Sequence, residues 1–232
     1  MIAEYKTALV VGAGDGLSAS LARLLAREGL RVALAARDID KLARLKAETG
    51  AVTIACDVAE MASVASLFGE LDGSFGAPDV VIFNPSRRTR GPFVELDRKE
   101  VAATLQVSAY GGFLVAQEAL KRMLPKRSGV ILFTGASASV KGYAESAPFA
   151  MAKFALRGLA QSLAREFQPQ GIHIGHVVID GAIRNPGRAE PPDRPDSMLD
   201  PDAVALAYLG LLNQHRSAWS WEIEVRPWTE RF

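Results

Sequence analysis

The sequence predicts an α/β fold in which a doubly wound, parallel β-sheet of about seven strands carries helices on both faces. Two observations lead to this fold class. Short runs rich in Val, Ile and Leu alternate along the chain with longer amphipathic segments, which is the order of strand–helix–strand units. The short runs are apolar on both sides, as strands are when helices cover both faces of a sheet. At 232 residues the chain is expected to form a single domain over residues 1–232.

The alternation gives each expected element a place. Strands are expected where the short apolar runs fall, at residues 7–11, 31–35, 51–55, 80–83, 130–134, 172–179 and 220–225. Helices are expected where apolar residues recur every three to four positions, at residues 17–27, 39–48, 63–71, 99–123, 148–167 and 202–212. Ligands of such sheets lie beyond the carboxyl ends of the strands, so the residues that follow the strands are the candidates for a site.

Composition excludes several classes of partner. The formal net charge of +1 shows no bias towards nucleic acid or an anionic membrane surface. No apolar stretch is long enough to cross a bilayer, and the N-terminus lacks a signal-peptide pattern. Cys56 is the only cysteine, so no intrachain disulfide forms, as is typical of the cytoplasm.

A glycine-rich loop follows the first expected strand and reads Gly12-Ala13-Gly14-Asp15-Gly16-Leu17. Glycines let the chain turn tightly and bring backbone N–H groups to a pyrophosphate at a helix N-terminus. Turns alone also need glycine. The position of this loop inside a strand–helix–strand unit favours a dinucleotide site of the Rossmann type.

Three polar residues end the next strands. Arg37 favours NADP, because arginine binds a 2′-phosphate where an acid binds a free ribose, although the adjacent Asp38 keeps NAD possible. Asp57 is placed to accept a hydrogen bond from an adenine amino group, or to cap a helix. Asn84 is placed to touch the ribose or to tie neighbouring strand ends together.

Phe149 and Lys153 stand four residues apart and therefore share one face of an expected helix. A tyrosine in place of Phe149 would form an acid–base pair with the lysine, whose ammonium lowers the pKa of a phenol. A phenyl ring cannot transfer a proton. The apolar neighbours of Lys153 predict that its ammonium does not face bulk water.

These motifs resemble the short-chain dehydrogenase/reductase family over nearly the whole chain. Gly12 and Gly16 match its Thr-Gly-x-x-x-Gly-x-Gly loop, Asp57-Val58 matches its adenine-contacting pair, and Asn84 keeps the second Asn of its Asn-Asn-Ala-Gly motif. The resemblance implies a nicotinamide dinucleotide, NADP with NAD possible, and a small-molecule substrate. It implies these cofactor-binding residues: Gly12, Gly14, Asp15, Gly16, Leu17, Arg37, Asp57, Val58, Asn84, Lys153, Gly181 and Ile183.

The family's catalytic set of Asn, Ser, Tyr and Lys is altered in this chain. Lys153 matches, Phe149 occupies the Tyr position, and Ser108 aligns with the Asn. The Ser position falls on Ala136, one residue before Ser137. The resemblance therefore implies Lys153, Ser137, Ser108 and Phe149 as the catalytic candidates, with the proton donor missing.

The resemblance also implies a substrate lid over residues 185–201 and pairing into a homodimer or homotetramer through the helix at 148–167 and the long one before it. Arg87, Arg88 and Arg90 follow the Asn84 loop and form either a solvated face or an attractor for a substrate phosphate or carboxylate. His173 and His176 stand three apart on a strand and face opposite sides, so no metal site is expected.

Two functions follow. The first is an NADP(H)-dependent oxidoreductase that reduces a carbonyl or activated double bond by an altered proton path. That path uses Lys153 through a water, the Ser137 hydroxyl, or Tyr143 swinging inward, while an activated double bond can draw its proton from water. The second is a non-catalytic dinucleotide-binding module, such as a regulatory subunit.

Overall fold

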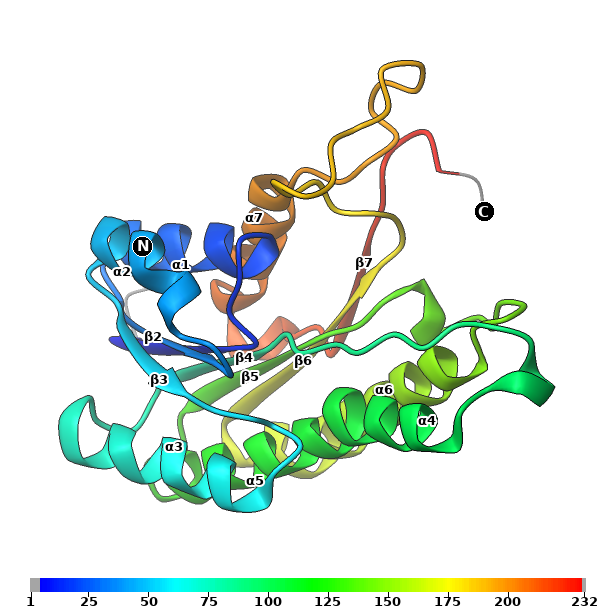
Figure 1. Ribbon diagram of the computed structural model, residues 1–232. Helices are drawn as coiled ribbons and strands as arrows, with labels where there is room; N and C mark the ends of the chain where they lie inside the picture. The colour runs from blue at the N-terminus through cyan, green and yellow to red at the C-terminus, as the bar shows by residue number, and fades with distance from the viewer. Residues whose placement is uncertain (1–4, 231–232) are drawn as a thin grey trace.

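All strands of the protein lie in one parallel sheet, in the computed structural model that describes residues 5–230 (Figure 1). The strand order is β3-β2-β1-β4-β5-β6-β7, with every neighbouring pair parallel. This confirms the doubly wound α/β fold. The strands are β1 (Thr7–Val11), β2 (Arg31–Ala36), β3 (Val52–Ala55), β4 (Val80–Phe83), β5 (Gly129–Thr134), β6 (Ile172–Ile179) and β7 (Glu222–Val225).

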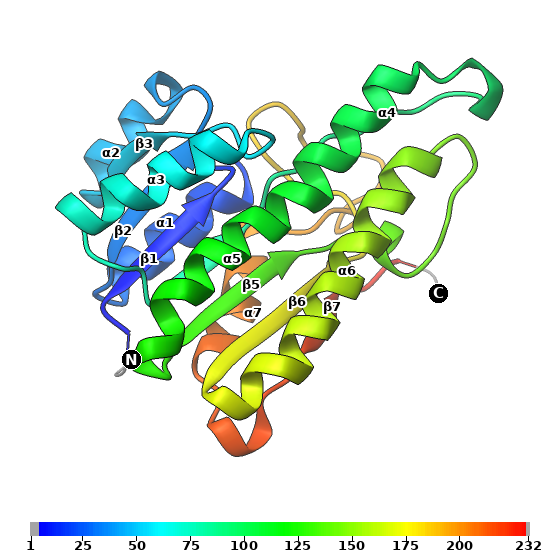
Figure 2. The same cartoon turned by 90° about the horizontal axis from the view of Figure 1, so that it is seen from below.

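Helices cover both faces of the sheet, as Figures 1 and 2 show. The α-helices are α1 (Leu17–Arg27), α2 (Ala43–Thr49), α3 (Met61–Ser74), α4 (Arg98–Leu105), α5 (Gly111–Met123), α6 (Ala147–Phe167) and α7 (Pro201–Leu212). Alternate residues of β1 enter different cores: Ala8 and Val10 pack on the face of α1 and α7, and Leu9 and Val11 on the face of α3, α5 and α6.

The helix expected over residues 99–123 is not α-helical throughout. A π-helical turn, Gln106–Tyr110, lies between α4 and α5 and connects them directly. Ser108 lies fully buried within this turn. Such π-turns are frequent at functional sites, because the extra residue turns the side chains before and after it onto different faces.

The segment 185–201 consists of turns and isolated bridges and projects from the body of the molecule beside the C-terminal strand (Figure 1). Two hydrogen bonds attach it to residues after β7: Trp228 Nε1 donates to Asp196 Oδ2 at 3.4 Å, and Thr229 Oγ1 donates to the Asp196 carbonyl at 3.0 Å. None of the helices in the described part of the chain combines the length and apolar character that a bilayer span requires.

Candidate active site at the carboxyl edge of the sheet

A cavity of about 300 Å³ opens at the carboxyl ends of β1, β2, β3 and β4. It gathers residues that are far apart in the sequence because parallel strands bring their carboxyl ends to one edge. Five predicted cofactor residues line it: Gly12, Arg37, Asp57, Val58 and Asn84. Lys41 and Cys56 line it as well and were not expected from the sequence.

Gly12 is required by the backbone at the start of this cavity. Its φ is +78°, a region that side chains disfavour, and its N–H donates to the Ala35 carbonyl at 2.9 Å. A Cβ at this position would lie 2.7 Å from the Pro85 backbone nitrogen. Any larger residue would therefore push β1 and β4 apart at the point where the cavity begins.

The rest of the glycine loop offers donors of the kind that a pyrophosphate needs. Among the described residues, the amides of Gly14, Asp15 and Gly16 have no protein acceptor. A Cβ on Gly14 would meet nothing within 4 Å, so the loop is open there, and Leu17 begins α1 from a buried position. Free amides at the N-terminus of a helix fit a diphosphate.

Asn84 ties the end of β4 to this loop. Its Nδ2 donates to Ser18 Oγ at 2.7 Å, and Ser18 Oγ donates to the Gly12 carbonyl at 3.0 Å. Asn84 also lines the cavity. Asn84 thus links the end of β4 to the loop after β1, and its contact with a ribose remains a prediction.

Positively charged side chains near the end of β2 line the cavity, and the Asp38 carboxylate does not. Arg37 and Lys41 both line the cavity, whereas the Asp38 carboxylate accepts the Asp40 N–H at 3.1 Å. The Asp57 carboxylate accepts the Ala59 N–H at 3.0 Å, and Glu60 rather than Asp57 is the N-cap of α3. The cationic side chains, and not Asp38, therefore border the cavity.

Lys153 is buried in α6 with only 2% of its surface exposed, which confirms that its ammonium avoids bulk water. The Nζ donates to the Thr134 carbonyl, at the carboxyl end of β5, at 2.8 Å. Burial, with a smaller effect from the positive charge of Arg88, lowers the pKa of Lys153 to about 8. Near neutral pH this lysine is thus charged yet ready to release a proton.

Phe149 is buried one turn before Lys153 on α6. Its ring centre lies 5.9 Å from Lys153 Nζ and 4.2 Å from the guanidinium carbon of Arg88. The ring thus lies near two cations, and it has no hydroxyl with which to contact either of them. The sequence named Arg88 as part of either a solvated face or an attractor for a substrate anion. It gave no sign that Arg88 stacks on Phe149, because 61 positions separate the two residues.

The hydroxyls of two serines in the turn after β5 differ in their hydrogen bonds. Ser139 is fully buried, and its Oγ accepts the Ala136 N–H at 3.1 Å. Ser137 is half-buried, and its hydroxyl forms no hydrogen bond within residues 5–230. Ser137 is therefore the hydroxyl that remains available to a ligand in the turn after β5.

Ser108 holds the loop that follows β4. Its Oγ accepts the Arg87 N–H at 2.9 Å, and the side chain is fully buried. This contact fixes the backbone one residue before Arg88. A role for Ser108 in catalysis remains a prediction.

Gly181 and Ile183 lie away from the cavity that Gly12 begins. Gly181 has a φ of +152°, and a Cβ there would lie 2.8 Å from the Pro227 side chain. Ile183 pairs with Leu199 across an isolated bridge at the base of the 185–201 segment. Their contacts to a cofactor remain predictions.

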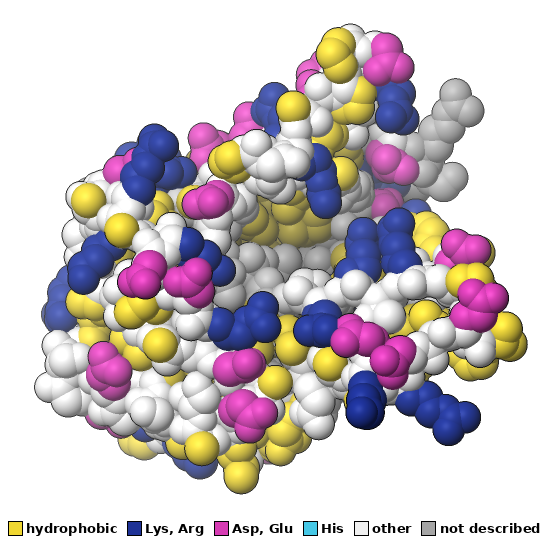
Figure 3. Space-filling model, viewed as in Figure 1, with side chains coloured by type: hydrophobic (Ala, Val, Ile, Leu, Met, Phe, Trp, Pro, Cys, Tyr) yellow, Lys and Arg dark blue, Asp and Glu magenta, His cyan; other side chains and the backbone are white. Residues whose placement is uncertain are grey.

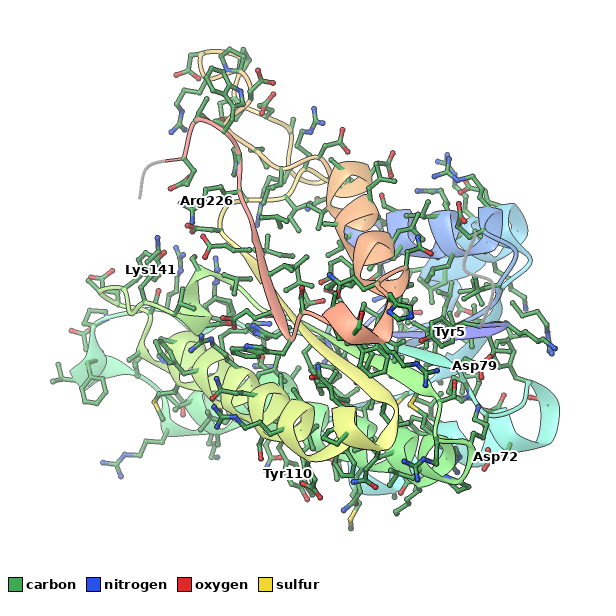
Figure 4. The ribbon with its side chains drawn as sticks, turned by 180° about the vertical axis from the view of Figure 1, so that it is seen from behind. Tyr5, Asp72, Asp79, Tyr110, Lys141 and Arg226 are labelled. Atoms are coloured by element: carbon green, nitrogen blue, oxygen red, sulfur yellow. The ribbon has the colours of Figure 1, made fainter. Side chains whose placement is uncertain are left out.

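Asp180, at the carboxyl end of β6, is buried and faces two cations. Lys141 Nζ lies 3.3 Å from Asp180 Oδ2, and Arg226 Nη2 lies 3.9 Å from the same oxygen. Figure 4 shows both cations reaching this edge from different segments, one after β5 and one after β7. Hydrogen bonding to Asp180 raises the pKa of Lys141.

Comparison with known proteins decides the family. The model of the short chain dehydrogenase family matches residues 6–189. This chain belongs to the short-chain dehydrogenase family. Two solved structures similar to this chain carry 5-hydroxy-NADP or NADP.

Individual relatives agree with this assignment. A crystal structure of a short-chain dehydrogenase from Rhodopseudomonas palustris is 35% identical, with a TM-score of 0.83, and covers 96% of this chain and 99% of that one. An alcohol dehydrogenase of the archaeon Thermococcus sibiricus, complexed with 5-hydroxy-NADP, is 25% identical, with a TM-score of 0.87 and coverage of 98% and 99%. An uncharacterized oxidoreductase of Staphylococcus aureus (strain N315) is 29% identical over 228 residues, 96% of this chain and 97% of its own length.

Proposed function

We propose that this protein is an NADP(H)-dependent oxidoreductase that reduces a carbonyl group or an activated double bond of a small molecule, with a proton path that does not use a phenol. One observation supports this above all. Lys153 is held at the carboxyl edge of β5, buried beside Phe149, with a pKa lowered to about 8. Lysine side chains are almost never fully buried, so the burial of Lys153 indicates a function for its ammonium.

The preference for NADP rests on the charges that border the cavity. Arg37 and Lys41 both line the cavity, which favours a 2′-phosphate, while the Asp38 carboxylate accepts a backbone N–H in its own turn. The related alcohol dehydrogenase carries a derivative of NADP. NAD is the alternative, and the relative affinities decide between the two.

The dinucleotide, when bound, supplies the hydride. Reduction of a ketone then leaves an alkoxide that needs one proton. Lys153 Nζ lies 5.9 Å from the centre of the Phe149 ring, and its lowered pKa suits proton donation near neutral pH, through a water that takes the place of the missing hydroxyl. The free hydroxyl of Ser137 is suited to donate a hydrogen bond to the developing negative charge.

The alternative is a module that binds the dinucleotide without turnover, which the altered catalytic set favours. The experiment that separates the two has two steps. Calorimetric titration with NADPH and NADH measures cofactor binding, and NADPH oxidation is then followed with a panel of ketones, aldehydes and enones. Binding together with turnover of any of these supports the oxidoreductase. Tight binding with no turnover supports the module, and no binding of either dinucleotide rejects both.

We also propose that the protein pairs into a homodimer, or a homotetramer built from it, through α5 and α6. Phe113, Met151 and Phe154 are large apolar side chains that stand 41–50% exposed on these helices. An apolar groove runs between the same helices, lined in part by Leu120 and Leu159. Exposed apolar side chains beside an apolar groove are typical of a subunit contact.

The single, buried Cys56 supports the cytoplasm as the compartment.

A further inference from the structure

The arginine that stacks on Phe149 gives the ring a role other than proton transfer. The guanidinium carbon of Arg88 lies 4.2 Å from the ring centre, within the range of a cation–π contact. Phe149 is buried and belongs to a long helix, so it is a rigid platform for a side chain that comes from a loop. The loop is fixed one residue earlier, where Ser108 Oγ accepts the Arg87 N–H. Arg88 is therefore held in place at both ends.

Further positive charges surround Arg88. Burial, and then the positive charges of the nearby Arg90 and Arg188, lower the pKa of Arg88. The charge of Arg88 in turn adds to the effect of burial on the pKa of Lys153. Within residues 5–230, Arg88, Arg90 and Arg188 take part in no ion pair. Like charges that gather without a carboxylate repel one another, and an anion that binds among them removes this cost.

Two arginines close to this group in the sequence do form ion pairs, so the absence of ion pairs is confined to the group itself. Arg87 Nη2 pairs with Glu100 at 2.5 Å, and Arg184 Nη2 pairs with Asp200 at 2.6 Å. Each of these flanks the group in sequence, one from the Asn84 loop and one from the segment that leads to the lid. The chain thus neutralises the arginines on either side, whereas Arg88, which stacks on Phe149, and its neighbours Arg90 and Arg188 have no ion-pair partner among the described residues.

The position of the group points to the substrate rather than to the cofactor. Gly12, Arg37 and Asp57 line the dinucleotide cavity, which Arg88, Arg90 and Arg188 do not. Arg88 instead contacts Phe149, beside the proposed acid Lys153, and Arg188 belongs to the 185–201 segment. Figure 3 shows a recess between this segment and the layer of α4 and α6, with Lys and Arg side chains at its rim.

We infer that the substrate carries an anionic oxygen group, a carboxylate or a phosphate, which Arg88 and Arg90 bind on the Phe149 platform and Arg188 covers from the lid. This rests on the proposed function, because it places the anion next to the carbonyl that is reduced. A guanidinium forms paired hydrogen bonds with either group. Phe149, which stands where the family pattern has a proton donor, then supports the arginine that binds the substrate.

The test uses the protein loaded with NADPH and matched pairs of probes. Levulinate and 2-pentanone differ by a carboxylate, and dihydroxyacetone phosphate and dihydroxyacetone differ by a phosphate. Calorimetric titration with each probe, to the loaded and the unloaded protein, gives dissociation constants without requiring turnover. We expect at least one anionic probe to bind ~10-fold or more tightly than its neutral partner, and the pair that responds identifies the group.

Three variants locate the contact. Arg88→Gln is expected to weaken the anionic probe ~10-fold or more, and Arg188→Gln several-fold, with no change for the neutral probe or for NADPH. Arg87→Gln is the matched control, because its guanidinium pairs with Glu100, and it is expected to change neither. Equal binding within both pairs, no binding of either anion, or an equal loss in Arg87→Gln overturns the inference.

Failure of this inference differs from failure of the proposed function. If NADPH binds and neutral carbonyl compounds are reduced without any preference for an anion, the inference is wrong and the oxidoreductase stands. If NADPH and NADH both fail to bind, the proposed function is wrong, and titration of the unloaded protein still decides whether the arginines bind an anion.

Discussion

The ammonium nitrogen of Lys153 lies 5.9 Å from the centre of the Phe149 ring and 2.8 Å from the Thr134 carbonyl oxygen. In the family pattern a phenol occupies the ring position, and the lysine lowers its pKa. Here the lysine keeps its place at the edge of β5 while the ring has lost its hydroxyl. Lys153 is thus a proton source beside the ring, and burial lowers its pKa to about 8.

Restoring the phenol should restore the ordinary proton path. Phe149→Tyr is expected to raise kcat for ketone reduction about 100-fold, because a positioned general acid contributes ~10²–10⁴-fold. The ring face that supports Arg88 is unchanged by a para hydroxyl. NADPH oxidation with a saturating ketone measures the effect. Phe149→Leu, which lacks both ring and hydroxyl, is the control, and an equal rate in both variants would show that the missing phenol does not limit turnover.

The wild-type rate should depend on the protonation of Lys153. Donation requires the ammonium form, so kcat is expected to be level below pH 8 and to fall about tenfold for each pH unit above it. Lys153→Met is expected to lose turnover across the range. Lys141→Gln is the matched control. Hydrogen bonding to Asp180 raises the pKa of Lys141, so Lys141 keeps its charge in the pH range where Lys153 loses its proton. A wild-type profile that stays level to pH 10 would assign the proton to another group.

Arg37 should select the 2′-phosphate. Arg37→Gln is expected to weaken NADPH binding about tenfold and NADH binding less than twofold, because only NADPH carries the phosphate that a cation contacts. Calorimetric titration of both dinucleotides measures this. Asp38→Asn is the control and is expected to change neither affinity, since the Asp38 carboxylate accepts a local N–H. Equal losses for NADPH and NADH in Arg37→Gln would contradict the preference for NADP.

A buried histidine should make the fold sensitive to mild acid. His176 is fully buried, its Nδ1 lies 3.0 Å from Glu222 Oε2, and burial lowers its pKa to about 4. The unfolded chain takes up a proton near the ordinary histidine pKa of about 6.5, but the folded chain does not until about pH 4. The free energy of unfolding therefore decreases as the pH falls from about 6.5 towards 4, by ~2 kcal/mol at pH 5.

Thermal unfolding at pH 7.5 and pH 5 measures this loss. The Tm of the wild type falls between pH 7.5 and pH 5, and in His176→Gln we expect this fall to be smaller by ~4–8 °C. His215→Gln, at an exposed histidine, is the control and should unfold with the wild-type pH dependence. If His176→Gln shows the same decrease as the wild type, other groups govern the acid sensitivity.

The face of α5 and α6 should carry the subunit contact. Phe154→Glu places a charge in the centre of an apolar face and is expected to yield monomers, because an unpaired carboxylate resists burial in an interface. Size-exclusion chromatography with light scattering measures the mass. Met61→Glu, at a methionine 67% exposed on α3, is the control and should leave the mass unchanged. A monomeric wild type would remove the basis for pairing through this face.

The sequence alone determined the order of strands and helices, because hydrophobic periodicity is a local property of the chain. It also determined that Phe149 and Lys153 share a helix face and that a glycine loop precedes α1, since both follow from short spacings. The boundaries of the single elements differ only by a few residues from those expected, as helix ends generally do.

The tertiary structure decided what depends on residues distant in the chain. The pKa of Lys153 follows from burial under several elements, and the stacking of Arg88 on Phe149 joins positions 61 residues apart. Whether Arg37 borders the cavity depends on how the ends of β1, β2, β3 and β4 meet at one edge of the sheet, which no spacing in the sequence reveals. Packing and charge act through space, so the chemistry of this edge becomes visible only when the strands lie side by side.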